Sequence, residues 1–89
     1  MPTEIHYGEP EGDRQSQLSY GGEAVELTFN PSKNPTVQRI KELYAEIIDS
    51  LNLATANAVT EESHSLHTEA IRQAQTAQMW AVKAITYPY

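Results

Sequence analysis

The cationic, aromatic and amide side chains of this 89-residue chain are the groups whose types and spacing could do chemistry. Six Lys and Arg residues stand among twelve Asp and Glu residues, and the net charge is −6. An acidic chain argues against generic binding to a nucleic-acid polymer, for which a basic surface is expected. It leaves room for a local pocket that binds one small anionic ligand.

The segment Phe29–Asn34 combines an aromatic ring, two amides, a hydroxyl and a lysine immediately before a predicted helix N-terminus. Exposed backbone donors and the helix dipole favour phosphate at such a position. The plainer interpretation is a strand-to-helix turn in which Asn34 caps the helix and Phe29 fills the core. On these residues alone the plain turn is preferred.

Four of the six cations, Arg39, Lys41, Arg72 and Lys83, lie on predicted helices. A helical lysine is usually a solvated residue whose stem covers apolar neighbours. Trp80 is more often a core residue than a ligand platform, although an indole can stack on a base.

The sequence contains no convincing catalytic or metal-binding set. His64 and His67 are three residues apart and could share a helix face, but neither His6 nor a carboxylate completes a metal site at a suitable spacing. We interpret the histidines as solvated. A Ser63–His64–Asp49 triad lacks any sign of a strained nucleophile turn. We therefore expect a protein that is not an enzyme and needs no cofactor.

The run 68–86 has the strongest helical periodicity and no internal Gly or Pro, and it belongs to a helix predicted over about 61–86. A stripe of small residues predicts a close-packing seam, and it consists of Ala70, Ala74, Ala77, Ala81 and Ala84. Ordinary core residues lie beside it at Ile71, Val82 and Ile85. A third stripe of mixed character could bind an anion, and it contains Arg72, Thr76, Met79, Lys83 and Thr86.

A second helix is predicted over about 35–52, with Asn34 as N-cap and Pro35 at the first helical position. Apolar residues at spacings of three and four predict its core stripe, namely Val37, Ile40, Tyr44, Ile47 and Leu51. On this assignment Lys41 lies mostly on the remaining surface. The two long helices should pack antiparallel.

Residues 1–14 read as an extended N-terminal arm, and 15–89 as one small domain. Two alternating runs flank Gly21-Gly22, which predicts a β-hairpin over about 15–29. The expected fold is thus mainly α, with a short N-terminal β-hairpin and an antiparallel two-helix hairpin. Because so short a chain supplies little core, self-association should complete it. With no membrane span, signal peptide or cysteine, the chain is expected to be cytoplasmic.

Two segments together resemble a known family. They are 27–35, continued by Val37, Ile40-Lys41, Tyr44-Ala45-Glu46 and Ile48-Asp49, and 74–86, with its Met79–Ile85 centre. They are similar to the phage hairpin-domain proteins that act as sponges against two bacterial defences, CBASS and Thoeris. The resemblance covers about residues 27–86.

The resemblance implies a non-enzymatic protein that sequesters cyclic di- and trinucleotides, or cyclic ADP-ribose isomers, inside an infected bacterium. It implies interlocked dimers that assemble into a hexamer, a trimer of dimers. By this analogy Lys41 contacts phosphate and Phe29 stacks on a base in a dimeric pocket, while Lys83 belongs to a three-fold site. Asn30, Arg72, Met79 and Trp80 are included because they lie near these residues.

Two alternatives remain open on the sequence. The first is a structural helical-hairpin module of a phage that oligomerises through the alanine seam and binds no ligand. The second is an enzyme that degrades cyclic nucleotides, which has little support because no metal set or general base is visible. The sequence does not indicate which cyclic nucleotide is preferred or whether both pocket types function.

Overall fold

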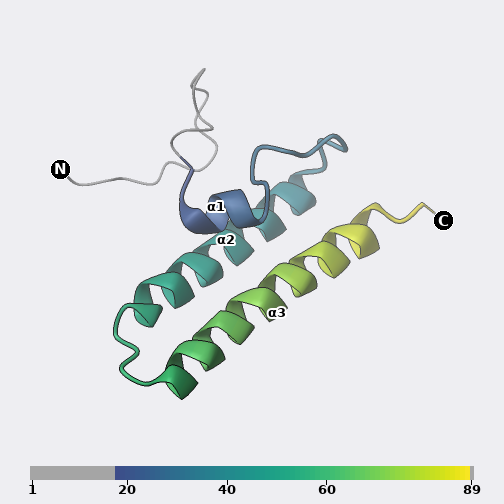
Figure 1. The fold of residues 1–89 in the computed structure, drawn as a ribbon. Helices are drawn as coiled ribbons and strands as arrows, with labels where there is room; N and C mark the ends of the chain where they lie inside the picture. The colour runs from purple at the N-terminus through teal and green to yellow at the C-terminus, as the bar shows by residue number, and fades with distance from the viewer. Residues whose placement is uncertain (1–17, 89) are drawn as a thin grey trace.

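A computed structural model describes residues 18–88, which are mainly helical and contain three helices but no strand. The long helices α2 (Pro35–Thr55) and α3 (Glu61–Thr86) run antiparallel as a helical hairpin, and the short α1 (Tyr20–Ala24) packs on α2 (Figure 1). The prediction of a mainly helical fold is therefore confirmed. The expected arm over 1–14 lies outside the described residues.

Local sequence signals account for the ends of the long helices. The Asn34 side chain accepts a hydrogen bond from the Thr36 N–H at 2.8 Å, and Pro35 occupies the first helical position. Thr60 caps α3 by accepting from the Ser63 N–H at 3.0 Å. Helix α2 begins at the predicted residue and continues to Thr55, three residues beyond the predicted end near 52, whereas α3 has the predicted bounds.

The predicted β-hairpin is wrong within residues 18–29, where α1 and a series of turns replace the strands; residues 15–17 of the expected first strand are outside the described part. Gly21 serves close packing of α1 on α2 instead of a tight turn. A Cβ on Gly21 would lie 2.1 Å from the carbonyl oxygen of Ala45, so only glycine lets α1 approach α2 this closely.

Hydrogen bonds to one carboxylate hold α1 in place. The Ser19 hydroxyl donates to Asp49 Oδ2 at 2.7 Å, and the Gly21 N–H donates to Asp49 Oδ1 at 2.7 Å. Ser19 also caps α1 by accepting from the Gly22 N–H at 3.0 Å. Since Asp49 lies in the C-terminal half of α2, this contact fixes the position along α2 at which α1 begins.

The buried face of α2 is rotated from the predicted one. Its buried residues are Val37, Lys41, Ala45 and Ile48, whereas Ile47 is exposed. The expectation that Lys41 lies mostly on the surface is therefore wrong. With Val25, Leu27 and Ile71, the apolar members of this face form a small core between α1, the following turns and the two long helices. That rotation carries a lysine to the inside of the fold.

The alanine seam is divided between buried and exposed positions. Ala70, Ala74 and Ala81 are partly buried in the hairpin, whereas Ala77 and Ala84 face outward in this single chain. The face of α3 that packs inward instead centres on Ile71 and Gln78. The seam thus contributes only in part to packing within one chain.

Candidate functional site

A pocket of about 570 Å³ lies between the loop that follows α1, the first turns of α2 and the C-terminal half of α3. Its volume falls in the range of small-molecule sites. Four residues singled out from the sequence line it together: Phe29, Asn30, Lys41 and Met79. Its remaining lining is largely apolar and includes Val25, Val37 and Val82, with Gln78 contributing an amide.

The loop that forms one wall is held by its own side chains. Asn30 Nδ2 donates to the Asn34 carbonyl oxygen at 3.1 Å and lies 3.4 Å from Gln38 Oε1, while Asn30 Oδ1 accepts from the Ser32 hydroxyl at 2.7 Å. Gln38 Nε2 in turn donates to the Leu27 carbonyl oxygen at 3.3 Å. Asn30 lines the pocket, but its amide is already used to shape the loop.

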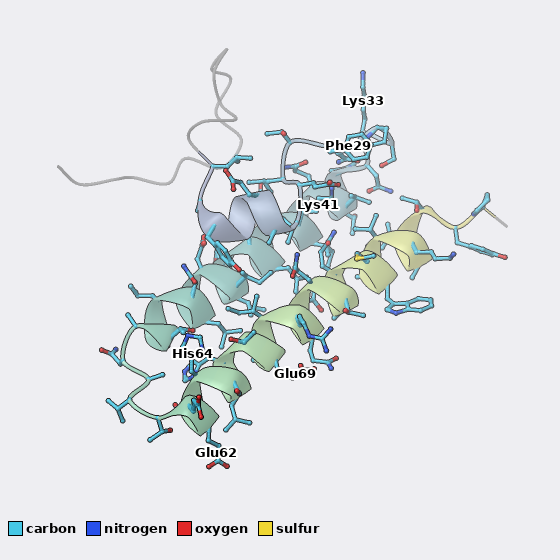
Figure 2. All side chains as sticks on the ribbon, viewed as in Figure 1. Phe29, Lys33, Lys41, Glu62, His64 and Glu69 are labelled. Atoms are coloured by element: carbon cyan, nitrogen blue, oxygen red, sulfur yellow. The ribbon has the colours of Figure 1, made fainter. Side chains whose placement is uncertain are left out.

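Lys41 reaches from α2 to the backbone of this loop and is only 5% exposed. Its Nζ donates to the carbonyl oxygen of Glu26 at 3.0 Å and to that of Phe29. An ammonium has three donors, so one N–H remains for another acceptor. Figure 2 shows Lys41 beneath the loop that carries Phe29, with Lys33 pointing away from the body of the molecule.

Burial lowers the pKa of Lys41 from its usual value of 10.5, and the charge of Glu26 opposes this shift. The ammonium is bonded to carbonyl oxygens and makes no ion pair within the described residues. Glu26 also lines the pocket, and its carboxylate attracts the ammonium from a distance without forming a direct ion pair. The remaining N–H of Lys41 can still donate to an anionic group placed in the pocket, although the chain as a whole is acidic.

Phe29 is exposed over 61% of its surface and does not fill the core as the plain-turn interpretation expects. Its ring centroid lies 5.6 Å from Lys41 Nζ, within cation–π range. Met79 lines the pocket from α3 and is also largely exposed. An aromatic face and a thioether next to a cation can hold a planar ring whose attached phosphate meets the ammonium.

Gln78 is a pocket residue that the sequence reasoning missed. It is 5% exposed, and its side chain forms no hydrogen bond in the part of the chain that the structure describes. A signal was present in the sequence, because Gln78 follows Ile71 by seven residues and precedes Ile85 by seven. A polar residue in phase with an apolar helical stripe marks a buried polar group.

The structure leaves three of the predicted site residues, Arg72, Trp80 and Lys83, outside this pocket. All three are exposed on α3 in the single chain, and Trp80 is not a core residue. Arg72 forms an ion pair with Glu69 at 3.1 Å, and hydrogen bonds from Gln73 and Arg72 lower the pKa of Glu69. One chain therefore brings Phe29 and Lys41 together but does not bring Lys83 to them.

The histidines that the structure describes lie at the far end of α3 from the pocket, where Figure 2 labels His64. His67 Nδ1 lies 2.8 Å from the Ser63 carbonyl oxygen, while His6 is outside the described residues. Among residues 18–88, no three His, Asp or Glu side chains gather in a group that could hold a metal ion. No helix in the same range has the length and hydropathy needed to cross a membrane.

Comparisons with protein-family models, with curated proteins and with solved structures find no match to this chain.

Proposed function

We propose that this protein is a non-enzymatic sponge that binds cyclic nucleotide immune signals and sequesters them from the effectors that sense them. The pocket carries the proposal: it places a buried ammonium, an exposed aromatic ring and a free amide around about 570 Å³ of space. Phosphate, base face and base edge are the three chemical parts of a nucleotide, and each has a counterpart here.

The contacts of Lys41 support phosphate binding at the pocket wall that this side chain lines. Two of its three donors hold the turn, so the ammonium is fixed in place before a ligand arrives. A fixed donor loses little side-chain entropy on binding, which favours affinity. Phe29, next to the same ammonium, is positioned for a base to stack on its ring.

The ligands proposed are cyclic ADP-ribose isomers of Thoeris and the cyclic di- and trinucleotides of CBASS, captured in the cytoplasm of an infected bacterium. This choice rests on the resemblance of residues 27–86 to the phage hairpin-domain sponges, together with the pocket. A polymer of nucleic acid suits the site less well, because the net charge is −6 and the pocket accommodates one small molecule.

Assembly into dimers and then into a hexamer is part of the proposal. Support comes from large apolar side chains that are exposed in the single chain, including Leu53, Val59, Leu66 and Trp80. Such side chains on a soluble protein commonly mark an interaction surface. Lys83 and Arg72 are exposed on the same helix as Trp80, so neighbouring subunits could share them in a second, three-fold site.

The same exposed apolar residues also favour the second candidate, a structural oligomerisation module that binds no ligand. Two substitutions separate the candidates. The module predicts that Lys83→Glu leaves function intact and that Ala77→Leu disrupts assembly, which light scattering would measure. The sponge predicts that Lys83→Glu weakens cyclic trinucleotide binding while the oligomer persists.

Calorimetric titration tests the proposed function. The panel consists of cyclic ADP-ribose isomers, cyclic dinucleotides and cyclic trinucleotides. A sponge should bind at least one of them with submicromolar affinity, about −8 kcal/mol or better. The bound ligand should be recovered intact after the protein is denatured by heat, whereas linear products would indicate an enzyme. Absence of binding to every member would refute the proposal.

A further inference from the structure

The amide of Gln78 is a buried polar group of the pocket whose side chain forms no hydrogen bond within the described residues. It is 5% exposed on the inner face of α3 and lines the pocket without a hydrogen-bond partner in the described part of the chain. Other glutamines of the region are engaged: Gln75 Nε2 donates to the Ala24 carbonyl oxygen at 3.3 Å, and Gln38 supports the loop. A buried amide without partners destabilises the fold, and a ligand in the pocket would supply the missing hydrogen bonds.

The chemistry of an amide restricts which part of a ligand it can bind. It presents a donor and an acceptor side by side, and a phosphate, which only accepts, would leave the amide oxygen unsatisfied. The edge of a nucleobase presents an adjacent donor and acceptor and satisfies both. Phosphate also has a better partner in the ammonium of Lys41.

We propose that Gln78 is a ligand-recognition residue whose amide forms paired hydrogen bonds with the edge of a nucleobase held in this pocket. The inference rests on the proposed function, because it assumes that the ligand carries a base. It assigns three parts of the ligand to three residues: the phosphate to Lys41, the base face to Phe29 and the base edge to Gln78. The amides of Asn30 in the loop and of Gln38 in α2 then position the wall and do not contact the base.

Stability without ligand provides the first test. Methionine matches the length and helix propensity of glutamine but needs no hydrogen bond, so Gln78→Met should raise the melting temperature of the ligand-free protein by about 4 °C or more. A fall of several degrees would overturn the inference, because the amide would then be supporting the fold. Gln73→Met is the matched control. Gln73 is exposed on the same helix and bonds Glu69 away from the pocket.

Binding provides the second test, with cyclic ADP-ribose, cyclic di-AMP and cyclic tri-AMP as probes. Gln78→Met should weaken the probe that the wild type binds by about tenfold to hundredfold, and Gln73→Met should not change its affinity. Equal binding by wild type and Gln78→Met would overturn the inference while leaving the sponge intact. No binding of any probe by the wild type would overturn both.

A double-mutant cycle distinguishes the base edge from the phosphate. The same probe is prepared with purine in place of adenine, so that the 6-amino donor is missing. Wild-type protein should bind the purine analogue about tenfold more weakly, and Gln78→Met should bind both forms equally. If the loss of affinity caused by Gln78→Met and the loss caused by the purine analogue simply multiply when combined, the amide does not contact this edge and the assignment is overturned.

Discussion

Two regions of the molecule, the contact between α1 and α2 and the pocket beside the loop, differ in how completely their polar groups are hydrogen-bonded. At α1, both carboxylate oxygens of Asp49 accept a hydrogen bond, and Gly21 has no Cβ that would hold the two helices apart. At the pocket, Lys41 retains a free donor, and the side chain of Gln78 has no hydrogen-bond partner among residues 18–88. The first contact is built for stability, and the second gives up stability where a ligand can be bound.

The largest effect on stability should come from disrupting the contact between α1 and α2. Gly21→Ala places a Cβ 2.1 Å from a backbone oxygen that cannot move independently of α2. We expect a loss of about 3 kcal/mol or more in the free energy of unfolding, enough to displace α1 in so small a protein. Urea denaturation at fixed protein concentration measures it.

Gly22→Ala is the matched control for that substitution. Its Cβ would meet only side-chain atoms of Leu18 and Ser19 at 3.3 Å, and alanine favours the helix. The unfolding free energy should stay within about 1 kcal/mol of wild type. Similar losses at both glycines would mean that close approach to α2 is not the reason for Gly21.

Removing the pocket cation should affect binding most. Lys41→Met deletes the charge that faces the ligand and leaves the Glu26 and Phe29 carbonyl oxygens without their donor. Affinity for the cyclic nucleotide bound by the wild type should fall about tenfold to hundredfold, as measured by calorimetry. Lys33→Met makes the same change of charge on a side chain that points outward, and it should bind normally (Figure 2).

The pH dependence of binding should reveal the buried position of Lys41. Since burial lowers its pKa below 10.5, the ammonium loses its proton at a lower pH than a surface lysine does, and affinity for an anionic ligand should fall as the pH rises through that pKa. Stability without ligand should change in the opposite direction. The unfolded chain binds more protons than the folded chain between the two pKa values, so stability rises with pH there.

Lys41→Arg isolates this titration, because a guanidinium stays charged throughout the accessible range. Calorimetry from neutral to alkaline pH should show that the variant loses the decline in affinity that wild type shows. A decline of the same size in Lys41→Arg would assign the titration to another group.

The smallest effect is expected at the tip of the loop. Lys33 has a φ of +56°, in the left-handed region where a Cβ is strained. Lys33→Gly should raise the free energy of unfolding by about 0.5–1 kcal/mol, while Lys33→Ala, which retains the Cβ, should not. Urea denaturation of the two variants makes the comparison, and a gain in both would point to the lost charge instead.

Local signals in the sequence were sufficient for the long helices but not for the segment before them. Asn34-Pro35 and Thr60 cap α2 and α3 within a few residues, so their starts can be read without knowledge of the rest of the fold. Gly21-Gly22 was misread because glycines that permit a tight turn and glycines that permit close packing look alike. The deciding partners, Ala45 and Asp49, lie more than twenty residues away.

Some residues of the candidate site could likewise be found from the sequence, and others could not. Phe29 and Lys41 were selected through a family resemblance, and the pocket does bring them together. Periodicity placed Lys41 on the surface, because a lysine ordinarily lies there and the turn carbonyls that hold it belong to another segment. Gln78 was overlooked although its spacing marks a core position. The role proposed for Lys83 would require other subunits, and it stays a prediction.

One NMR titration tests most directly whether the pocket, and not the α1 contact, is the binding site. The side-chain amide of Gln78 and the backbone N–H of Gly21 are observed while the cyclic nucleotide found by calorimetry is added. We predict that the Gln78 signals shift to saturation with the calorimetric affinity and that the Gly21 signal stays in place. Saturable binding that leaves the Gln78 amide unmoved would contradict the account.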